Sequence, residues 1–346
     1  MNIHIINPLS DPRWDDLVDR HPEASVFHQR GWLEALARTY GYKPLALTTS
    51  AAGGPLSDGM VLCKVSSWIT GTRLVSLPFA DHCEPLSSGQ GEAADFMGRL
   101  RKECDRQRWR YVELRPLSGA PGMGDGLRPS GSYWTHELDT RPNLEVIFQA
   151  LHKNSFQRKI RRADRERLSY EKGTSELLLD DFYRLVLVTR RRHHLLPQPR
   201  TWFRNLLECL RDKIQIAVAR KDGVAVGAIL TLRHRSTIVY KYGCSDKRYH
   251  NAGAMPFLFW KLVEEAKATG AEKIDFGRTD LDNEGLIRFK DRLGTSRKMI
   301  TYYRYSCEKE QKAVAGWRSR GFHGFCSLLP DTLFSTAGGV LYRHIG

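Results

Sequence analysis

Four charged residues lie close together in the segment IDFGRTDLDNEGLIRFKDRLG, residues 274–294. Asp275 ends a short apolar strand, Arg278 follows a glycine, and Arg288 and Lys290 belong to a helix-like stretch. A carboxylate at a strand end can accept a proton. A lysine ammonium can stabilise the negative charge that develops on a carbonyl oxygen during acyl transfer. These residue types therefore predict an acyl-transfer site, with Lys290 and Arg278 as its cations. The alternative is an Asp–Arg pair that fixes the strand end.

Two adjacent histidines lie in the segment TRRRHHLLPQPRTWF, residues 189–203. Imidazole titrates near neutral pH, so His193 or His194 could take the proton of an attacking amine. The sequence shows no partner carboxylate beside them, which favours a surface or packing role for each histidine taken alone. We count His194 and Asp275 as the candidate bases, with the choice left open.

A strongly basic helix is predicted within LHKNSFQRKIRRADRER, residues 151–167. Phe156, Ile160 and Ala163 share one face, so the helix can pack while its cations point outward. The excess of Lys and Arg over acidic residues predicts a surface for a substrate phosphate or an RNA backbone. The alternative is a solvated helix face. The candidate ligands are Arg158, Lys159, Arg161 and Arg162.

Alternating strands and helices must position these residues. In the first half we expect strands and helices in the order of a mixed α/β unit: strands at 3–6, 44–49, 60–66, 73–77, 110–116 and 133–139, and helices at 12–20, 29–40 and 90–108. In the second half we expect helices at 143–167, 179–194, 200–211, 254–269 and 283–292, and strands at 213–220, 224–233, 236–245, 273–276 and 297–305. The turn KDG, residues 221–223, predicts a hairpin.

The order of antiparallel strands, helix, strand, helix and last strand is typical of an acetyltransferase (GNAT) fold. We therefore predict an α/β (α+β) protein with two tandem GNAT-like domains, at residues 1–142 and 143–308, and a helical tail at 309–346. Many GNAT enzymes hold a CoA pyrophosphate in a turn with the pattern [RQ]-x-x-G-x-[GA] at a helix N-terminus. RYHNAG, residues 248–253, resembles that turn, except that Asn251 replaces the first glycine. Arg248, Asn251 and Gly253 are the donor-binding candidates.

The composition limits the function classes. A net charge of +15 favours anionic partners such as phosphates, nucleic acid or a membrane surface. The seven cysteines are isolated, which argues against a disulfide framework and a thiolate metal site. We expect no metal, no signal peptide, no membrane span and a cytoplasmic location. The amphipathic segment 327–346 predicts either peripheral contact with the inner face of the plasma membrane or a helix packed on the second domain.

Four segments together resemble the FemABX-like transferases. GLIRFKDRLG, residues 285–294, resembles the family signature F-K-x-x-[FWL]-G, and KNSFQRKIRRA, residues 153–163, resembles its K-x-x-R-x-x-I-R-R-A helix. SVFHQRGWLEAL, residues 25–36, and SLPFADHCEPL, residues 76–86, resemble its N-terminal helix start and its L-P-F loop. The absence of a long coiled-coil insertion makes the chain more similar to a CelD/BcsL-like subset associated with exopolysaccharide and exosortase systems.

The resemblance implies transfer of an acyl or aminoacyl group to an amine of an envelope precursor, such as a peptidoglycan precursor, or of an amino sugar. It implies that Lys290 stabilises the transition state and that basic residues hold a phosphate-bearing acceptor. We add Arg288, Tyr242, Phe79 and Trp32 to the expected substrate-binding residues. The donor stays open between aminoacyl-tRNA and a thioester of CoA or acyl carrier protein, and no tightly bound cofactor is expected. The competing hypothesis is a non-catalytic adaptor that binds nucleic acid or polysaccharide-synthesis machinery through the basic helix.

Overall fold

The computed structural model describes residues 2–87, 89–119, 126–306 and 330–346. The chain divides into two compact units. Unit 1 comprises residues 2–133, 300–306 and 340–346, and unit 2 comprises residues 134–299 and 330–339, within the described ranges. Two strands, β6 (Arg128–Asp139) and β12 (Ser296–Tyr305), begin in one unit and end in the other. The chain therefore contributes its later residues to the first unit as well as to the second.

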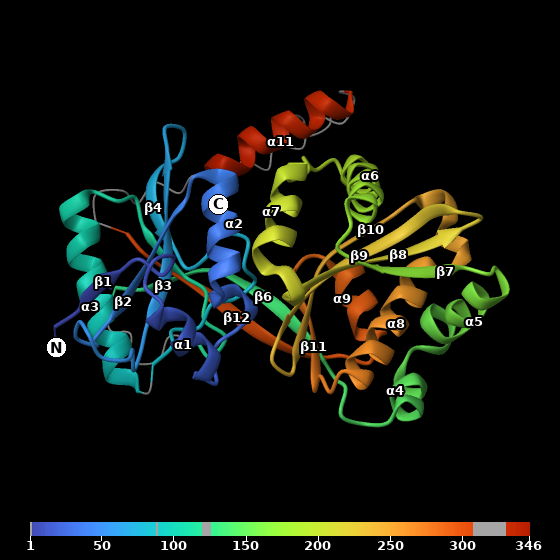
Figure 1. The fold of residues 1–346 in the computed structure, drawn as a ribbon, viewed down its shortest axis with the longest axis horizontal. Coiled ribbons are helices and arrows are strands. Elements are labelled where there is room, and N and C mark those ends of the chain that lie inside the picture. The colour runs from blue at the N-terminus through green and yellow to red at the C-terminus, as the bar shows by residue number, and fades with distance from the viewer. Residues whose placement is uncertain (1, 88, 120–125, 307–329) are drawn as a thin grey trace. The chain divides into compact units, whose positions relative to one another are not determined.

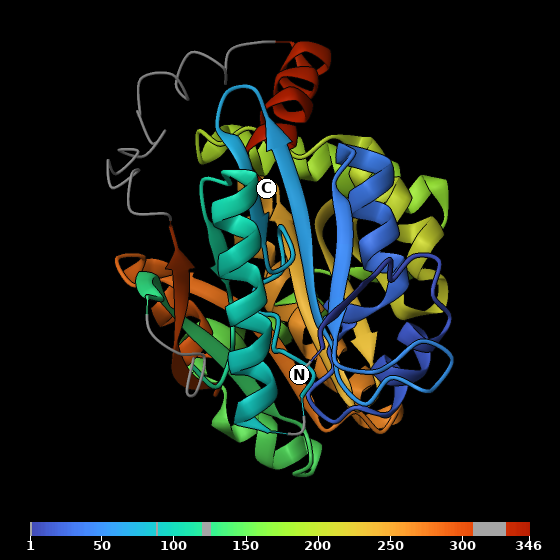
Figure 2. The same cartoon turned by 90° about the vertical axis from the view of Figure 1, so that its left-hand side faces the viewer.

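Unit 1 is a sheet covered by helices on both faces. Its strands follow the order β1 (His4–Ile6), β2 (Lys43–Thr48), β3 (Met60–Ser67), β4 (Gly71–Val75), β5 (Val112–Leu114) and β12. Helix α3 (Gln90–Gln107) packs Phe96, Met97 and Leu100 on one face (Figure 2). Helices α1 (Arg13–Arg20) and α2 (Arg30–Tyr40) lie on the other (Figure 1).

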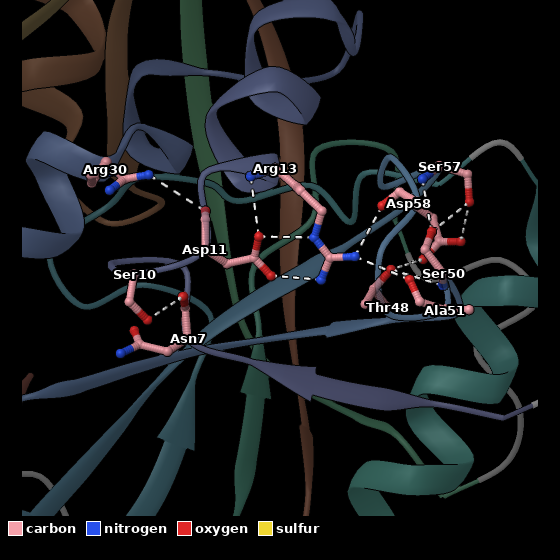
Figure 3. Close-up of polar contacts among 11 residues, drawn as sticks. Asn7, Ser10, Asp11, Arg13, Arg30, Thr48, Ser50, Ala51, Ser57 and Asp58 are labelled. Atoms are coloured by element: carbon pink, nitrogen blue, oxygen red, sulfur yellow. Dashed lines mark hydrogen bonds and ion pairs between the residues drawn. The ribbon is translucent and has the colours of Figure 1, made fainter.

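A polar network joins the start of unit 1 to the loop between β2 and β3 (Figure 3). Arg13 pairs with Asp11 at 2.7 Å and donates to the backbone oxygens of Ala51 and Gly54, each at 3.0 Å. Asp58 is buried and accepts from the Thr48 hydroxyl at 3.1 Å and from the Ser57 hydroxyl at 3.0 Å. A buried carboxylate is tolerated only when its oxygens receive such donors. The network therefore ties the loop to helix α1 and to the end of β2 through polar contacts.

Unit 2 is a three-layer α/β/α structure (Figure 1). Its strands follow the order β6, β11 (Lys273–Asp280), β10 (Thr237–Ser245), β9 (Val224–His234), β8 (Ile214–Lys221) and β7 (Ser169–Gly173). Helices α6 (Glu176–Arg192) and α7 (Arg200–Leu210) cover one face. The other face carries α4 (Leu144–Ala150), α5 (Arg158–Arg165), α8 (Ala254–Ala268) and α9 (Glu284–Asp291). The core between sheet and α8 includes Phe257, Leu258 and Leu262.

Strands β10 and β11 are parallel but separate along their length. Thr237–Val239 pair with Lys273–Asp275, and each strand then continues, to Ser245 and to Asp280. The pairing of β10 with β9 shifts register between Tyr240 and Tyr242, which is a β-bulge. A bulge bends and twists its strand. The bend turns the end of β10 away from β11 and makes room at the carboxyl ends of both strands.

The structure corrects the predicted single helix at 143–167. Helix α4 ends at Ala150, Leu151 is extended, and a π-helical turn (Lys153–Gln157) precedes α5. The buried Gln157 side chain donates to the backbone oxygens of Leu151 at 2.8 Å and of Phe148 at 3.1 Å. It thereby satisfies carbonyls that the end of a helix leaves without partners. Strand β7 was not predicted, because its residues, SYEKG, carry little apolar content.

Most other predicted elements are confirmed within a few residues. The predicted hairpin is present: Asp222 and Gly223 both have positive φ, 50° and 79°, and Lys221 pairs with Val224. Helix α11 (Asp331–Ile345) lies in the predicted tail, and the rest of the tail, residues 309–329, lies outside the described residues. No helix in the described part of the chain has the length and apolar content that crossing a membrane requires.

Candidate acyl-transfer site

Unit 2 contains a cavity of about 1010 Å³ where β10 ends. Its walls come from seven places along the chain: the π-helical turn and α5, the end of α6, β9, the end of β10, the 3-10 helix Lys247–Ala252, the start of α8, and α9. The separation of β10 from β11 places the strand end Ser245 and the first residues of α8, Ala254 and Met255, on this cavity. The N-terminus of a helix favours anions, because its backbone N–H groups and dipole point at them.

The charges that line the cavity are all positive. Lys159, Arg192, Arg288 and Arg292 line it, and no Asp or Glu is among its described lining residues. Arg192 donates to the backbone oxygen of Ser245 at 2.9 Å, and Arg292 donates to the Ser155 hydroxyl at 3.2 Å. These bonds orient both guanidinium groups. Apolar walls from Leu195, Met255 and Leu286 accompany them. Such a lining suits a ligand with an anionic part and an apolar part.

Two histidines also line the cavity. The pKa of His250 is lowered by burial, and then by the charges of Arg192 and Lys159. The pKa of His193 is lowered by burial and by Arg192 and Arg190. His250 Nε2 lies 3.0 Å from the Ser245 hydroxyl oxygen and 3.4 Å from an Arg192 nitrogen, which can only donate. Both imidazoles are therefore neutral at neutral pH and able to accept a proton.

Lys290 and Asp275 meet at the backbone of Gly277 in β11. Lys290 is buried and donates to the backbone oxygen of Gly277 at 2.9 Å and to that of Arg278 at 3.2 Å. Asp275 is buried and accepts from the Gly277 N–H at 2.7 Å. Gly277 has φ of 67°, a conformation that glycine adopts at little cost. The two side chains thus hold one turn of the backbone, and neither is among the lining residues of the cavity.

A buried histidine, His136, lies near Lys290 and Asp291 in unit 2. His136, on β6, has no exposed surface, and neither ring nitrogen has a hydrogen-bond partner among the described residues. Its Nε2 is 3.5 Å from a carboxylate oxygen of Asp291, too far for a good hydrogen bond. Burial, and then the charge of Lys290, lower the pKa of His136 to about 4. Nothing in the residue pattern around position 136 indicates this neighbour of Lys290.

The predicted site residues fall into several groups. Lys159 and Arg288 line the cavity, whereas Arg158, Arg161 and Arg162 do not. Arg161 lies over the Phe148 ring, and Arg162 pairs with Glu166. His194 is exposed at the end of α6, one residue from the lining residue His193.

The predicted donor loop is a 3-10 helix, Lys247–Ala252. Arg248 is exposed and pairs with Asp246 at 2.6 Å, and Asn251 is exposed. Gly253 has φ of 84°, and a Cβ there would collide with the Lys159 carbonyl. Arg248, Asn251 and Gly253 do not line the cavity, but Tyr249, His250 and Ala254 do.

Three predicted substrate-binding aromatics are packing residues in the structure. Trp32 is fully buried and meets the Phe27 ring edge-on at 5.0 Å. Phe79, in unit 1, packs on Tyr40. Tyr242 accepts a hydrogen bond from the Trp202 indole at 2.9 Å and packs against the Phe203 ring, and both of these residues belong to α7. Helix α7 covers the sheet face opposite α8 (Figure 1). None of the three lines the cavity.

Sequence reasoning missed several lining residues that lie inside segments it had selected. Arg192 belongs to the run TRRRHH, His250 to the RYHNAG loop and Arg292 to the FKDRLG motif. Their presence in those segments is the feature of the sequence that could have identified them as site residues. Only the fold shows which side chains of each segment line one space, because each segment contains both lining and non-lining positions.

Comparison with known proteins agrees with this architecture. Residues 151–291 match the family model of an acetyltransferase (GNAT) domain. No curated protein sequence matches the chain. Among solved structures, FemX is similar with a TM-score of 0.71 and 14% identity, over 89% of this chain and 98% of that one.

Two further solved structures share the fold. L-PGS from Bacillus licheniformis has a TM-score of 0.55 and 14% identity, over 86% of this chain and 92% of its own. A tandem GNAT protein from the clavulanic acid biosynthesis pathway has a TM-score of 0.54 and 12% identity, over 88% and 98%. The predicted tandem GNAT-like fold is confirmed, and the FemABX resemblance is confirmed at the level of the fold. The part of the chain with a family match is residues 151–291, which are similar to acetyltransferase (GNAT) domains.

Proposed function

We propose that this protein is an N-acyl- or aminoacyltransferase that forms an amide on an amine of a cell-envelope precursor or amino sugar. The observation that carries the proposal is the cationic cavity of unit 2, which lies at the start of α8 within a GNAT domain. Its cations suit the phosphates that either candidate donor carries, an aminoacyl-tRNA or a thioester of CoA or acyl carrier protein. Its apolar walls suit the acyl part.

The reaction we propose is direct attack of the acceptor amine on the donor carbonyl carbon. The new bond joins the amine nitrogen to that carbon, and the ester or thioester bond to the donor breaks. The amine proton passes to a base, which returns it to the leaving oxygen or sulfur, so that the donor departs as an alcohol or a thiol. His193 and His250 fit the base better than the predicted His194 or Asp275, because they line the cavity and are neutral at neutral pH.

Lys290 keeps its predicted role as the stabilising cation, and it binds the backbone oxygen of Arg278, the other predicted cation. The Lys290 ammonium lies at the Gly277 turn of β11, on the same helix as the lining residues Arg288 and Phe289. A fixed charge in a buried environment acts more strongly on developing negative charge than a solvated one does. The same proposal includes three further points. The acceptor is an envelope precursor, the protein is linked to exopolysaccharide systems, and it acts at the inner face of the plasma membrane.

Turnover by a Lys290 variant tests the catalytic part of the proposal. Purified protein is incubated with acetyl-CoA or with an aminoacylated tRNA and an amine-bearing UDP-sugar, and the amide product is measured by mass spectrometry. We expect Lys290→Met to lower turnover by about a hundredfold or more. Lys298→Ala, which removes an exposed lysine on β12, is the matched control and retains turnover.

Stability must be measured on the same variants, because Lys290 also holds two backbone oxygens. Activity is therefore compared at a temperature at which circular dichroism shows Lys290→Met to be folded. Full turnover by folded Lys290→Met would remove Lys290 from the mechanism. A covalent acyl-enzyme recovered from denatured protein would contradict direct attack.

A further inference from the structure

The hairpin between β3 and β4 exposes two large apolar side chains at its tip. Trp68 is 87% exposed and Ile69 is 38% exposed. The strands on either side bury their own apolar residues, including Val65 and Leu74. A folded protein in water gains nothing from presenting an indole in this way, and exposed aromatic tips mark surfaces that another phase or partner covers.

The end of helix α11 lies beside this tip, within unit 1 (Figure 2). The His344 ring meets Trp68 edge-on at 5.8 Å, and His344 Nδ1 is 3.0 Å from the Ser67 hydroxyl. The buried Arg73 guanidinium donates to the backbone oxygens of His344 at 2.8 Å and Gly346 at 2.7 Å. This anchoring presents Ile345, 44% exposed, next to the hairpin. We call Trp68, Ile69 and Ile345 the hairpin patch.

The surroundings of the hairpin patch carry positive charge. Three segments build this end of unit 1: residues 64–73, 108–111 and 340–346. The first two are joined by Arg110, which donates to the Thr70 carbonyl at 3.1 Å. They contain no Asp or Glu. Apart from the buried Arg73, their cations are Lys64, Arg108, Arg110 and Arg343. A protruding apolar tip surrounded by cations matches the interface of an anionic bilayer, where Trp rings lie at the headgroup level and lysine or arginine meets lipid phosphate.

We propose that the hairpin patch docks the protein on an anionic phospholipid membrane by inserting Trp68 and Ile69 into the interface. Docking on a membrane extends the proposed function, and it rests on that function because the proposed acceptor is linked to a membrane. Vesicle binding needs neither donor nor acceptor, so the two can fail separately.

A membrane explains the patch better than a nucleic acid or a protein partner. Two of its three side chains are isoleucines, which offer no ring on which a base can stack. The patch is also a hairpin tip, whereas stable protein interfaces cover a broad area of about 800 Å² on each partner.

Sedimentation with lipid vesicles tests the proposal on the full chain. We expect wild-type protein to bind vesicles of phosphatidylglycerol and phosphatidylcholine, and to bind pure phosphatidylcholine far less. Trp68→Ala combined with Ile69→Ala should weaken binding by about tenfold or more, because each side chain loses its apolar burial. Leu177→Ala, which removes a 65% exposed leucine on α6 in unit 2, should bind as wild type does.

Three outcomes would overturn the proposal. The first is that wild type does not bind anionic vesicles in low salt. The second is that the double variant binds them as well as wild type does. The third is that wild type binds single-stranded RNA instead of vesicles and that the double variant loses this RNA affinity. A protein that transfers an acyl group without binding vesicles overturns the docking surface alone. A protein that binds vesicles through Trp68 but transfers nothing overturns the proposed function alone.

Discussion

At the scale of the residue, the backbone turn at Gly277 explains why the charges of residues 274–294 lie together. Asp275 and Lys290 bind the N–H and the carbonyl of the same glycine. The sequence showed the charges but not their partners, because a backbone group gives no signal in a residue pattern. Arg288, two residues before Lys290, points into the cavity and pairs with Glu284 at 2.9 Å. Helix α9 thus carries both Lys290, which binds the backbone turn, and Arg288, which lines the cavity.

The buried imidazole of His136 makes a residue-scale prediction about stability. Its pKa in the folded protein is about 4, below the value near 6.5 of an unfolded histidine. Between these two pH values the unfolded chain binds the proton and the folded chain does not, so stability falls as pH falls. We expect this histidine to remove about 2–3 kcal/mol of unfolding free energy from pH 6.5 to pH 4.

His136→Leu separates this effect from the titration of carboxylates. Urea unfolding of wild type and variant is compared at several pH values, with hydrogen exchange of β6 and β11 amides as the local probe. As pH falls from 6.5 to 4, the unfolding free energy of wild type should decrease by more than that of His136→Leu, because only wild type carries this histidine. Parallel curves for the two proteins over this pH range would show that His136 does not titrate as its surroundings require.

At the scale of the element, the approach of α5 to the start of α8 builds the cavity. Gly253 allows it, because a side chain there would collide with the Lys159 carbonyl. Gly270, which follows α8, also has positive φ, 67°, but a Cβ there would meet nothing within 4 Å. The two glycines are therefore a matched pair: each substitution by alanine costs about 1 kcal/mol of backbone strain.

We expect Gly253→Ala to destabilise the protein by more than Gly270→Ala and to weaken donor binding, because α5 and Lys159 must move. Thermal unfolding and a binding titration with acetyl-CoA or an aminoacylated tRNA, measured on both variants, check this. Equal effects of the two substitutions on binding would mean that the contact between α5 and α8 does not shape the donor site.

Element order was largely predictable, and the break in the basic helix was not. Hydrophobic periodicity places α8, β8, β9 and β10, and turn residues place the hairpin at 221–223. The break after Ala150 depends on the Gln157 side chain, which caps carbonyls six to nine residues earlier. The divergence of β10 from β11 depends on a bulge between two tyrosines that a strand pattern cannot reveal. These features shape the cavity, so its lining was less predictable than its elements.

At the scale of the whole molecule, the charge of +15 is divided between distinct surfaces. One group of cations lines the cavity of unit 2, and another surrounds the hairpin patch of unit 1. The sequence showed the total charge and the basic helix, yet Arg161 and Arg162 of that helix interact with Phe148 and Glu166 instead of the cavity. Net charge therefore indicated anionic partners, and only the fold assigns the cations to places where such partners can bind.

The most direct test of the account is donor binding by a protein that lacks two cavity cations. Calorimetric titration with acetyl-CoA and with an aminoacylated tRNA is performed on wild type, on Lys159→Ala/Arg292→Ala, and on Arg128→Ala/Lys298→Ala, which removes the same charge from exposed positions outside the cavity. The account predicts that wild type binds one donor, that the cavity variant loses about a hundredfold in affinity, and that the control does not. Equal affinities for the two variants, or no binding of either donor by wild type, would contradict it.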